Sequence, residues 1–541
     1  MHFIDYELVN LLKYQENKQA TLLRQYMSMP HYYVTTPIFY VNSGPHIGHA
    51  YTSVVTDTAA RLKRLLGHKV KLLTGTDEHG QKIQQAANLK NENCVEFTDK
   101  MSRLFRELMV ACNVSNDDFI RTTEQRHKSA VIHAWEALQK SGNIYLGKYS
   151  GWYCVKEEAF FQKSELTNDL LSPTGAPVEW VEEDSYFFAL SKWQNQLIEF
   201  YEQNPDFIQP KNKANEVTNF IKSGLKDLSI SRTSCTWGIP VPNDSKHTIY
   251  VWLDALMNYI SAIGYPDQDS LEFQKFWPES VHVIGKDILR FHAVYWPAFL
   301  MALNLPLPKN LVVHGWWMKD GQKMSKSLGN VVDPIPLINN FGVDAVRYFL
   351  LREIPVGNDG SISKEAFLKR VNNELADKIG NLVQRTLVLV KQNFESKVPK
   401  IESQQFDILS HPLLIESKAV LSHIKNSVID MQFHESLRLI VDLANSTNKY
   451  LETSAPWNTL KSSKEDAAYS LYVTLEIIRH IGIYLQPFIP NSASKILDQL
   501  SIPFNKRTLH HASAEFAIIS NTPIQHLGII FRKVDAESAE I

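Results

Sequence analysis

The sequence predicts an α/β fold in which a parallel sheet is built in two halves, separated by an insertion and followed by an all-helical domain. Three observations predict it. Strand, helix and strand alternate twice along the chain. The alternation is lost in between, over residues 141–240, and from residue 371 onward apolar residues recur with the helical period. The 541 residues, 44% of them hydrophobic, are enough for several cores.

The first half of the sheet is expected over residues 31–140. The apolar run HYYVTTPIFYV indicates a buried strand that ends near Pro37. Polar residues followed by Pro45 mark a helix start, and an apolar stripe continues until Gly67 stops the helix. KVKLLTGTDEHG is the next strand with its exit loop. This order completes a βαβ unit, which implies parallel strands.

The second half is expected over residues 241–322, after an insertion over residues 141–240 with its own small fold of turns and short strands. VHVIG indicates a strand, KDILRFHAVYWPAFLMAL a helix and NLVVHG another strand. Residues 371–520 are expected to form a helical bundle, because apolar residues keep the helical period there. Residues 521–541 are expected to be a loose tail.

Composition excludes several classes of protein. The net charge of -2 gives no general basic field, so a nucleic-acid partner would require a local patch. No apolar run approaches about 18 residues, which argues against a transmembrane helix. Residues 1–30 have no secretory core and are expected to be disordered or a start-site artefact. The scattered cysteines indicate reduced thiols in an intracellular protein. They are Cys94, Cys112, Cys154 and Cys235.

PHIGHA, residues 45–50, places His46 and His49 around Gly48 at the predicted helix start. A zinc helix places its histidines four apart with a carboxylate between them, and core histidines would each need a partner. An anion fits better, because the first helical turn offers free N–H groups and the positive end of the helix dipole. On these residues alone, the metal and core interpretations stay open.

DGQKMSKSLGN, residues 320–330, places Lys323 and Lys326 on a glycine-flanked loop after a strand of the second half. Such a pair is ordinarily solvated charge. Across one crevice from His46 and His49, however, the lysines suit a polyphosphate whose transition state must be neutralised by preorganised charge.

HIGH and KMSKS, in this order across a split α/β sheet, are the paired signatures of class I aminoacyl-tRNA synthetases, which the chain resembles over residues 31 to about 520. It is most similar to the members specific for methionine. The supporting stretches are YYVTTPIFYVNSGPHIGHAYTSVVTD, LLTGTDEHGQKI, YVWLDALMNYI, IGKDILRFHAVYWPAFL and KMSKSLGN. The resemblance implies a split Rossmann-like catalytic domain with a connective insertion, a KMSKS loop and stem-contact region over residues 323–370, and an anticodon-binding helical bundle.

The resemblance also implies the reaction. The carboxylate of L-methionine would attack the α-phosphate of ATP, with Mg²⁺ accompanying the nucleotide, and would give methionyl-adenylate and pyrophosphate. The methionyl group would then pass to the 3' end of tRNA(Met). The expected catalytic residues are His46, His49, Lys323 and Lys326. The expected ATP-binding residues are His46, Gly48, His49, Lys326, Gly285 and Asp287.

Two further sets of residues follow from the resemblance. Aromatic rings suit a polarizable thioether, and Asp77 would bind the substrate ammonium, although the same rings could be simple core. The matching pocket residues are Ile38, Tyr40, Asp77, Trp252, Ala255, Tyr259, Phe291, His292 and Trp296. In the helical region Asn381, Arg385 and Trp457 are expected to read the anticodon, although a polar pair on a helix is usually solvated surface.

The insertion departs from many relatives, which carry a zinc knuckle there. A structural zinc site needs four ligands, and this segment offers Cys154, with Glu157, Leu171 and Thr174 near the places of the others. We therefore expect no metal site and no zinc. No dimerising β-barrel domain follows the bundle in the sequence, so a monomer is expected.

Two other interpretations stay open. One is another class I synthetase, for leucine or cysteine. The other is a non-catalytic tRNA-binding protein derived from a synthetase, against which the intact HIGH and KMSKS motifs argue. The expected location is the cytoplasm, with the mitochondrial matrix as the alternative, and no membrane partner is expected.

Overall fold

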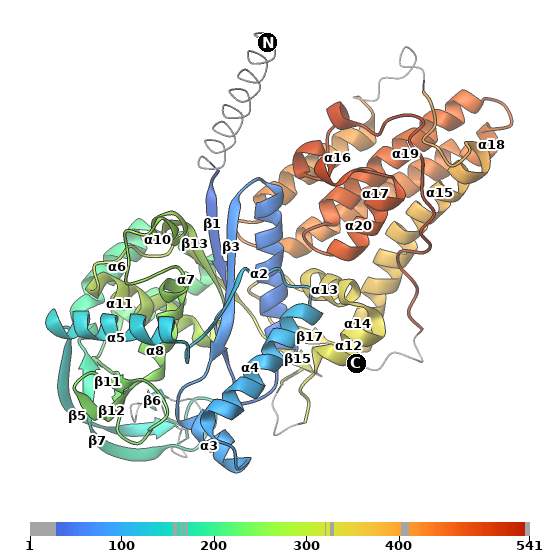
Figure 1. Ribbon diagram of the computed structural model, residues 1–541. Helices are drawn as coiled ribbons and strands as arrows, with labels where there is room; N and C mark the ends of the chain where they lie inside the picture. Colours follow the sequence, from blue (N-terminus) through green and yellow to red (C-terminus); the bar gives the residue numbers. More distant parts are fainter. Residues whose placement is uncertain are drawn as a thin grey trace, which may run out of the picture.

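The computed structural model describes residues 29–154, 159–161, 163, 166–167, 171–319, 321–324, 329–401 and 410–535. Within them a seven-stranded parallel sheet and a long helical domain lie side by side (Figure 1). The sheet runs in the order β2-β3-β1-β13-β14-β8, and β4 pairs with β3. The strands are β1 (His31–Thr35), β2 (Phe39–Tyr40), β3 (Lys69–Asp77), β4 (Asp118–Arg121), β8 (Ile208–Gln209), β13 (Ser280–Gly285) and β14 (Asn310–His314).

The two predicted halves meet in the middle of this sheet. β1 begins the first half and β13 the second, and the two pair in parallel, with Val34 opposite Val281. β3 lies on the far side of β1, and β14 on the far side of β13. The chain therefore turns outward in opposite directions from β1 and β13, which is the kind of switch point at which open α/β sheets bind ligands.

Both faces of the sheet are covered, because successive strand residues enter different cores. Val34 packs into a core that includes α2 (Ile47–Leu65) and α4 (Cys94–Ala111), while its neighbour Tyr33 packs into a core with α5 (Gln125–Lys140). β13 divides in the same way, with Val283 in the first core and Ile284 in the second. This alternation is what the period of two in a strand requires.

The helix expected over KDILRFHAVYWPAFLMAL is divided into three pieces. They are the 3-10 turn η4 (Lys286–Ile288), the π-helical turn η5 (Phe291–Tyr295) and α11 (Trp296–Ala302). A π-helical turn inserts one residue into the helical repeat and so shifts the side chains that precede it onto another face. The prediction of a helix was right, but its regular geometry was not.

The insertion folds into two small antiparallel sheets. The first contains β5 (Ile144–Cys154), β6 (Ala159–Phe161), β7 (Glu179–Phe188) and β9 (Leu228–Ser229), and the second β10 (Ser231–Arg232), β11 (Pro240–Val241) and β12 (Asp244–Ile249). Between β7 and β9 the chain forms α6 (Gln194–Gln203) and α7 (Lys211–Lys222) and returns to the main sheet as β8, which pairs in parallel with β14. We expected the insertion to have its own small fold. It is not wholly separate, because its strand β8 forms an edge of the main sheet.

A short mixed region connects the sheet to the helical domain. Its elements are β15 (Trp317–Lys319), β16 (Gln322–Lys323), α12 (Pro334–Phe341), α13 (Val343–Arg352), β17 (Gly360–Ile362) and α14 (Lys364–Leu368). The π-helical η7 (Lys369–Gly380) continues from α14 into the bundle. Among all described residues, no helix is both long enough and apolar enough to cross a membrane.

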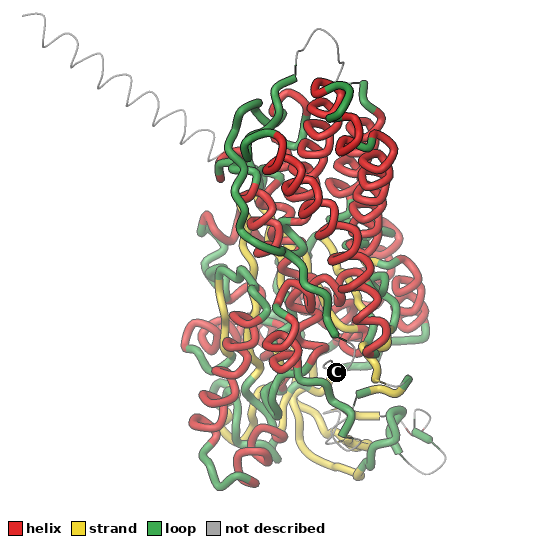
Figure 2. The backbone as a smooth tube through the Cα atoms, turned by 90° about the vertical axis from the view of Figure 1, so that its right-hand side faces the viewer, coloured by secondary structure: helices red, strands yellow, loops and turns green. Residues whose placement is uncertain are grey.

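The helical domain confirms the helical period read from residue 371 onward. Figure 2 shows its helices as an elongated bundle beyond the strands. They are α15 (Asn381–Asn393), α16 (Pro412–Asn426), α17 (Phe433–Ser454), α18 (Pro456–Thr459), α19 (Lys464–Leu485) and α20 (Pro490–Gln499). The first core runs without interruption from α2 through α13 into α19, so the sheet and the bundle share one apolar interior.

The prediction of a loose tail after residue 520 was wrong for the described part. Asn372 donates to the Val534 carbonyl oxygen at 2.9 Å and accepts from the Val534 N–H at 2.8 Å. Lys533 pairs with Asp377 at 2.7 Å, and Phe531 is buried against η7. The tail lacks regular structure, so its sequence carries no periodic signal, yet it is fixed along the bundle by these contacts.

Candidate active site

Several of the residues expected at the active site lie at the carboxyl edge of the sheet. β1, β3, β13 and β14 end side by side at Thr35, Asp77, Gly285 and His314. Helix α2 starts at the same edge, because it follows β1 and β2. The edge therefore brings together both histidines of HIGH, the glycine that ends β13 and the carboxylate that ends β3.

His46 and His49 cap the helix that they begin. The Nδ1 atom of His46 accepts from the Gly48 N–H at 3.1 Å, and the Nδ1 atom of His49 accepts from the His46 N–H at 3.0 Å. Because each Nδ1 is an acceptor, each neutral ring carries its proton on Nε2. The two rings lie 3.8 Å apart, so they present two Nε2–H donors close together.

The expectation that free N–H groups of the first helical turn would bind an anion was wrong. The N–H groups of the first turn are already used, since that of Ile47 donates to Val332, that of Gly48 to the His46 ring and that of His49 to the His46 carbonyl. The backbone thus offers no free donors here. An anion at this helix start would therefore need other donors, such as the imidazole Nε2–H groups.

The His49 ring is held neutral and in place. Burial and the neighbouring His46 lower the pKa of His49 well below its ordinary value. Its ring packs edge-on against Phe39 at 4.9 Å and Phe105 at 5.1 Å. Glycine at position 48 leaves room for the His46 ring, because a Cβ at that position would lie 2.9 Å from His46 Cε1. The three residues form one fixed unit at the helix start.

The chain that follows the second motif returns to this helix start. Lys323 lies in β16, which pairs with β15, whereas Lys326 and its two serines lie outside the described residues. Just after them, the Val332 carbonyl accepts from the Ile47 N–H at 2.9 Å. The chain that leaves KMSKS is therefore bonded directly to the first residue of α2.

Gly285 and Asp287 lie beside the same edge. A Cβ on Gly285 would approach Asp287 Oδ1 to 2.6 Å, so glycine makes room for that carboxylate. Asp287 accepts from the Trp316 indole at 3.1 Å. The next neighbour is His314, whose Nε2 lies 2.8 Å from the hydroxyl of Thr52 on α2. β13, β14 and α2 are thereby linked through side chains.

The expected methionine pocket forms one aromatic cluster. The rings of Trp252 and Phe291 stack with centroids 3.6 Å apart, and Trp252 lies across His292 at 6.3 Å. The Tyr259 hydroxyl donates to His292 Nε2 at 2.8 Å, while His292 Nδ1 donates to the Ile288 carbonyl at 3.0 Å. Burial lowers the pKa of His292 to about 4, so the ring stays neutral and its tautomer is fixed.

Other expected pocket residues are near this cluster. Ile38 and Ala255 pack with Trp252 and with Tyr250, just before α8 (Val251–Leu256). Tyr40 pairs with Asp77 across β2 and β3, and Asp77 is buried. Trp296 is fully buried in the second core, so for this residue the structure agrees with the alternative of simple core.

Several residues that position the cluster were missed in the sequence. The Trp296 indole donates to His282 Nε2 at 3.3 Å, and His282 Nδ1 lies 2.9 Å from the Thr35 hydroxyl. The ring of His282 also stacks on Tyr259 at 4.0 Å. A histidine inside the buried strand VHVIG was an available signal, because a polar ring in a core needs hydrogen-bond partners.

A buried carboxylate behind the pocket was missed too. Asp254 of α8 lies 2.6 Å from His79 Nδ1 and 2.7 Å from His127 Nε2. Burial alone would raise the pKa of Asp254, but the two histidines outweigh it and hold the pKa at about 2. This triad ties the loop after Asp77 to α8 and α5.

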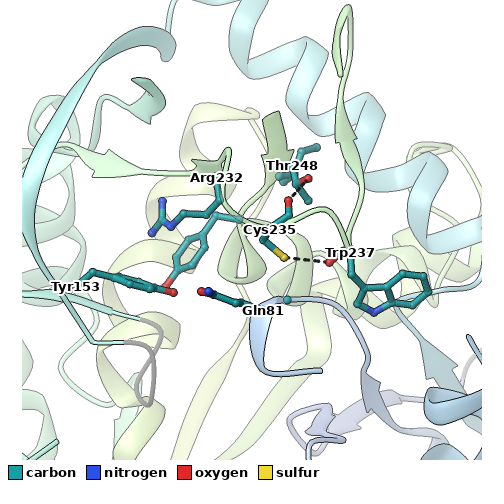
Figure 3. Close-up of a pocket in the computed structure, with 9 residues that line it drawn as sticks. Gln81, Tyr153, Arg232, Cys235, Trp237 and Thr248 are labelled. Atoms are coloured by element: carbon teal, nitrogen blue, oxygen red, sulfur yellow. Dashed lines mark hydrogen bonds between the residues drawn. The ribbon is translucent and has the colours of Figure 1, made fainter. Parts of the chain in front are cut away.

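A small open pocket, drawn in Figure 3, lies next to the aromatic cluster, because its lining residue Tyr250 packs with Trp252. The Arg232 guanidinium lies 4.1 Å over the ring of Tyr250, and Cys235 donates to the Trp237 carbonyl. None of the residues expected to bind substrate lines this pocket. Its lining consists of Gly80, Gln81, Tyr153, Arg232, Cys235, Trp237, Thr248, Ile249 and Tyr250.

Within the described ranges, no group of three or more His, Cys, Asp and Glu side chains has the arrangement of a metal site. Cys154 is buried at the end of β5, and Leu171 and Thr174 carry no metal-binding group. Glu157 lies outside the described residues. These residues do not fit a zinc knuckle, which needs four ligands.

At the far end of the helical domain Arg385 and Trp457 come together. The guanidinium lies 5.6 Å from the centre of the indole ring and 3.5 Å from the carboxylate of Glu452. Trp457 is 37% exposed, two residues after the left-handed Ala455 that separates α17 from α18. Asn381 starts α15, one turn before Arg385. The cluster is an exposed ring beside a cation, which suits an unpaired base.

Two protein families match the chain. The family described as tRNA synthetases class I (M) matches residues 32–170 and 162–387, and the anticodon binding domain of methionyl tRNA ligase matches residues 408–540. A methionine–tRNA ligase of Rickettsia bellii is 55% identical over 508 residues, which cover 93% of this chain and 99% of the relative. One of Mesorhizobium japonicum is 48% identical over 502 residues, covering 92% and 96%.

Solved structures agree with these relatives. The methionyl-tRNA synthetase of Mycobacterium tuberculosis in complex with methionyl-adenylate matches with a TM-score of 0.90 at 43% identity, covering 93% of this chain and 100% of that one. The free form of the enzyme from the same organism matches with a TM-score of 0.83 at 40% identity, covering 94% and 99%. The likeness thus extends over both the sheet and the bundle.

Proposed function

The chain belongs to the class I tRNA synthetases for methionine, and from this membership we propose that it activates L-methionine with ATP and charges tRNA(Met). In the first step a carboxylate oxygen of methionine bonds to the α-phosphorus of ATP, the bond to the β-phosphate oxygen breaks, and pyrophosphate leaves. In the second step the methionyl group moves from the adenylate to the terminal ribose of the tRNA, which releases AMP.

One observation carries the proposal: the paired Nε2–H donors of His46 and His49 at the carboxyl edge of the sheet. Neutral imidazole N–H groups at a fixed spacing can donate to phosphate oxygens, and they do so without adding a positive charge to the site. Gly48 keeps the first ring in position, and Gly285 and Asp287 line the edge where the rest of ATP would lie. Mg²⁺ would arrive with the nucleotide.

Lys323 and Lys326 would act on the same phosphates. The α-phosphorus gains charge density as the new bond forms, and a lysine that meets it there lowers the barrier. Support comes from the backbone bond between Val332 and Ile47, because it anchors the end of the lysine segment to the helix that carries the histidines.

Methionine would lie between the aromatic cluster and the end of β3. Asp77 ends a central strand at the buried edge, where a carboxylate is the natural partner for an ammonium group. Trp252, Phe291 and Tyr259 offer faces to a polarizable thioether. Because His292 is neutral and donates to Ile288, it orients Tyr259 without placing a charge beside the apolar side chain.

The helical domain would read the anticodon through Asn381, Arg385 and Trp457. An exposed indole can stack an unpaired base, and a guanidinium can donate to a base edge or a phosphate. The contacts of Arg385 with Glu452 and with Trp457 are weak ones at an exposed surface. Both side chains are therefore available to exchange these contacts for contacts with RNA.

Exchange of labelled pyrophosphate into ATP tests this function. We expect exchange with methionine and much slower exchange with each of the other amino acids, without any tRNA. Faster exchange with leucine or cysteine would identify another class I synthetase. A folded chain that binds tRNA but supports no exchange would instead be the non-catalytic protein.

We further propose that the enzyme is a zinc-free monomer that works in the cytoplasm. The zinc proposal rests on the poor ligand set around Cys154. Elemental analysis after dialysis tests it, and near-stoichiometric zinc together with loss of activity on chelation in excess magnesium would contradict it. Light scattering tests the monomer, and localisation of the tagged chain tests the compartment against the mitochondrial matrix.

A further inference from the structure

A buried arginine lies between the catalytic domain and the helical domain. Arg347 of α13 is 1% exposed, and each of the three nitrogens of its rigid guanidinium donates a hydrogen bond. Its Nε donates to the Phe488 carbonyl at 2.8 Å, and its Nη2 to the Pro487 carbonyl at 3.2 Å. Its Nη1 donates to the Cys112 carbonyl at 3.0 Å and pairs with Asp57 at 2.8 Å. One side chain thus bonds three other segments of the protein.

Asp57 places α2, the helix of the HIGH motif, in this contact. It is fully buried and accepts from the Ser115 N–H at 2.7 Å and the Ser115 hydroxyl at 2.6 Å, besides pairing with Arg61 at 2.7 Å. Burial alone would raise the pKa of Asp57, but Arg347 and Arg61 outweigh it and keep the carboxylate ionised. Asp57 lies eight residues beyond His49, about 12 Å along the same rigid helix.

The opposite side of the contact leads to the anticodon end. Pro487 and Phe488 form the turn after α19, a helix of 22 residues and therefore about 33 Å long. At its other end, α19 begins at Lys464, shortly after α18, which contains Trp457. Figure 1 shows α18 at this end of the helical domain. A displacement of α19 caused by an RNA at that end would reach the carbonyls that hold Arg347.

We propose that Arg347 is a positioning residue that transmits the placement of α19 to α2, so that anticodon contact raises the rate at which methionine is transferred to tRNA. This inference rests on the proposed function. The contact of Arg347 with Asp57 and the two carbonyls is rigid. Arg347 cannot leave the carbonyls without a loss of buried hydrogen bonds, and it cannot leave Asp57 without leaving an unpaired charge in the interior. A movement of the turn therefore shifts α13 and α2 together.

A different outcome is expected if the pair only holds the domains together. Loss of a purely structural contact lowers every activity by a similar factor, because it lowers the amount of intact enzyme. Loss of a transmitting contact leaves amino-acid activation intact and removes the kcat advantage of the correct anticodon. The KM part of that advantage remains, since Arg385 and Trp457 are untouched.

The test uses the full chain with Arg347→Lys and, separately, Asp57→Asn. Lysine keeps the charge but cannot make the fork of bonds, and asparagine keeps the shape but not the charge. Each variant is assayed for methionine-dependent exchange without tRNA, and for charging of a tRNA(Met) transcript and of the same transcript with a replaced anticodon. We expect exchange within about 3-fold of wild type, and at least a 10-fold fall in the ratio of the two kcat values for charging.

Arg479→Lys is the matched control. Arg479 is as buried as Arg347 and also bonds a buried carboxylate, Glu476, and two backbone carbonyls. All of these partners lie within the helical domain, so the same substitution perturbs that domain without touching α2. The kcat ratio should stay within about 2-fold of wild type in this variant.

Two results would overturn the inference. One is an equal fall of exchange and charging with an unchanged kcat ratio, which is the structural outcome. The other is an unchanged ratio in variants that fold and exchange normally. If neither variant folds, Ser115→Ala, which removes the hydroxyl bond from Ser115 to Asp57, decides the matter, with an expected fall in the ratio of about 3-fold. Absence of methionine-dependent exchange by the wild type would reject the proposed function itself.

Discussion

The sheet edge and the far end of the helical domain differ in how firmly their side chains are held. At the sheet edge His46, His49 and His292 are each fixed by hydrogen bonds to the backbone or to a neighbouring side chain, and nearby rings pack against them. At the far end of the bundle Arg385 and Trp457 rest on one another at the surface. The first region is preorganised and the second is adaptable.

This difference matches the work proposed for each region. A transition state lasts too briefly for groups to reorganise, so groups that stabilise it must be in place beforehand. An anticodon loop, by contrast, can splay its bases onto exposed rings as it binds, and a surface side chain loses little by changing partner. Substitutions should therefore alter chemistry at one region and tRNA selection at the other.

The largest effect should come from Lys326→Ala. If the lysine loop meets the α-phosphorus in the transition state, exchange with methionine should slow by roughly 10²–10³ while the KM for methionine stays nearly constant. Steady-state exchange kinetics measure both quantities. A raised KM for methionine with unchanged turnover would show that the lysine binds ground state and transition state equally.

Gly48→Ala tests whether the sheet edge depends on exact placement. The added Cβ would lie 2.9 Å from His46 Cε1, so the ring must move although the helix can still form. Exchange should fall by about 10–100-fold, because small displacements of catalytic groups are costly. Gly44→Ala is the comparison, since a Cβ there meets no atom within 4 Å. Equal activity of the two variants would show that the sheet edge does not depend on exact placement of the His46 ring, and so would contradict the difference between the two regions.

Trp457→Ala should affect only the adaptable region. Loss of one stacked base costs roughly 1–3 kcal/mol, so charging should fall by about tenfold or somewhat more, while exchange without tRNA stays the same. Phe504→Ala removes another exposed aromatic ring of the same domain, 88% exposed, and should change neither reaction. Equal damage by Trp457→Ala to both reactions would make Trp457 a structural residue.

The remaining effect should be on stability at low pH. The pKa of His292 is about 4 in the folded protein, against about 6.5 when unfolded, so between these pH values the unfolded chain binds the extra proton. Stability from this group is complete above about pH 6.5 and is lost as the pH falls toward 4, by roughly 3 kcal/mol. His292→Gln should flatten the pH dependence of urea unfolding over this range, with pH 8 as the reference. An unchanged slope would contradict the buried neutral ring.

The sequence alone predicted those helices, strands and motif positions that follow from hydrophobic periodicity and from short motifs. The strands of both halves, α2 and the bundle follow from apolar patterns, and HIGH marked the start of α2 at the edge where these strands end. It could not reveal Arg347 or Asp254, because their partners lie far away in the chain and no local pattern marks a long-range hydrogen bond. The histidine in VHVIG signalled a buried polar ring at His282, but not its partners Thr35 and Trp296. For the same reason the tail through Val534 was expected to be loose.

The central claim is that the sheet edge, and not the pocket beside it, is where methionine is activated. A crystal structure of the chain with a stable analogue of methionyl-adenylate tests it most directly. We predict the phosphate within hydrogen-bond distance, roughly 3 Å, of the Nε2 atoms of His46 and His49, the ammonium group at Asp77 and the thioether among Trp252, Phe291 and Tyr259. An analogue bound instead in the pocket lined by Arg232 and Tyr250, with both histidines untouched, would contradict the account.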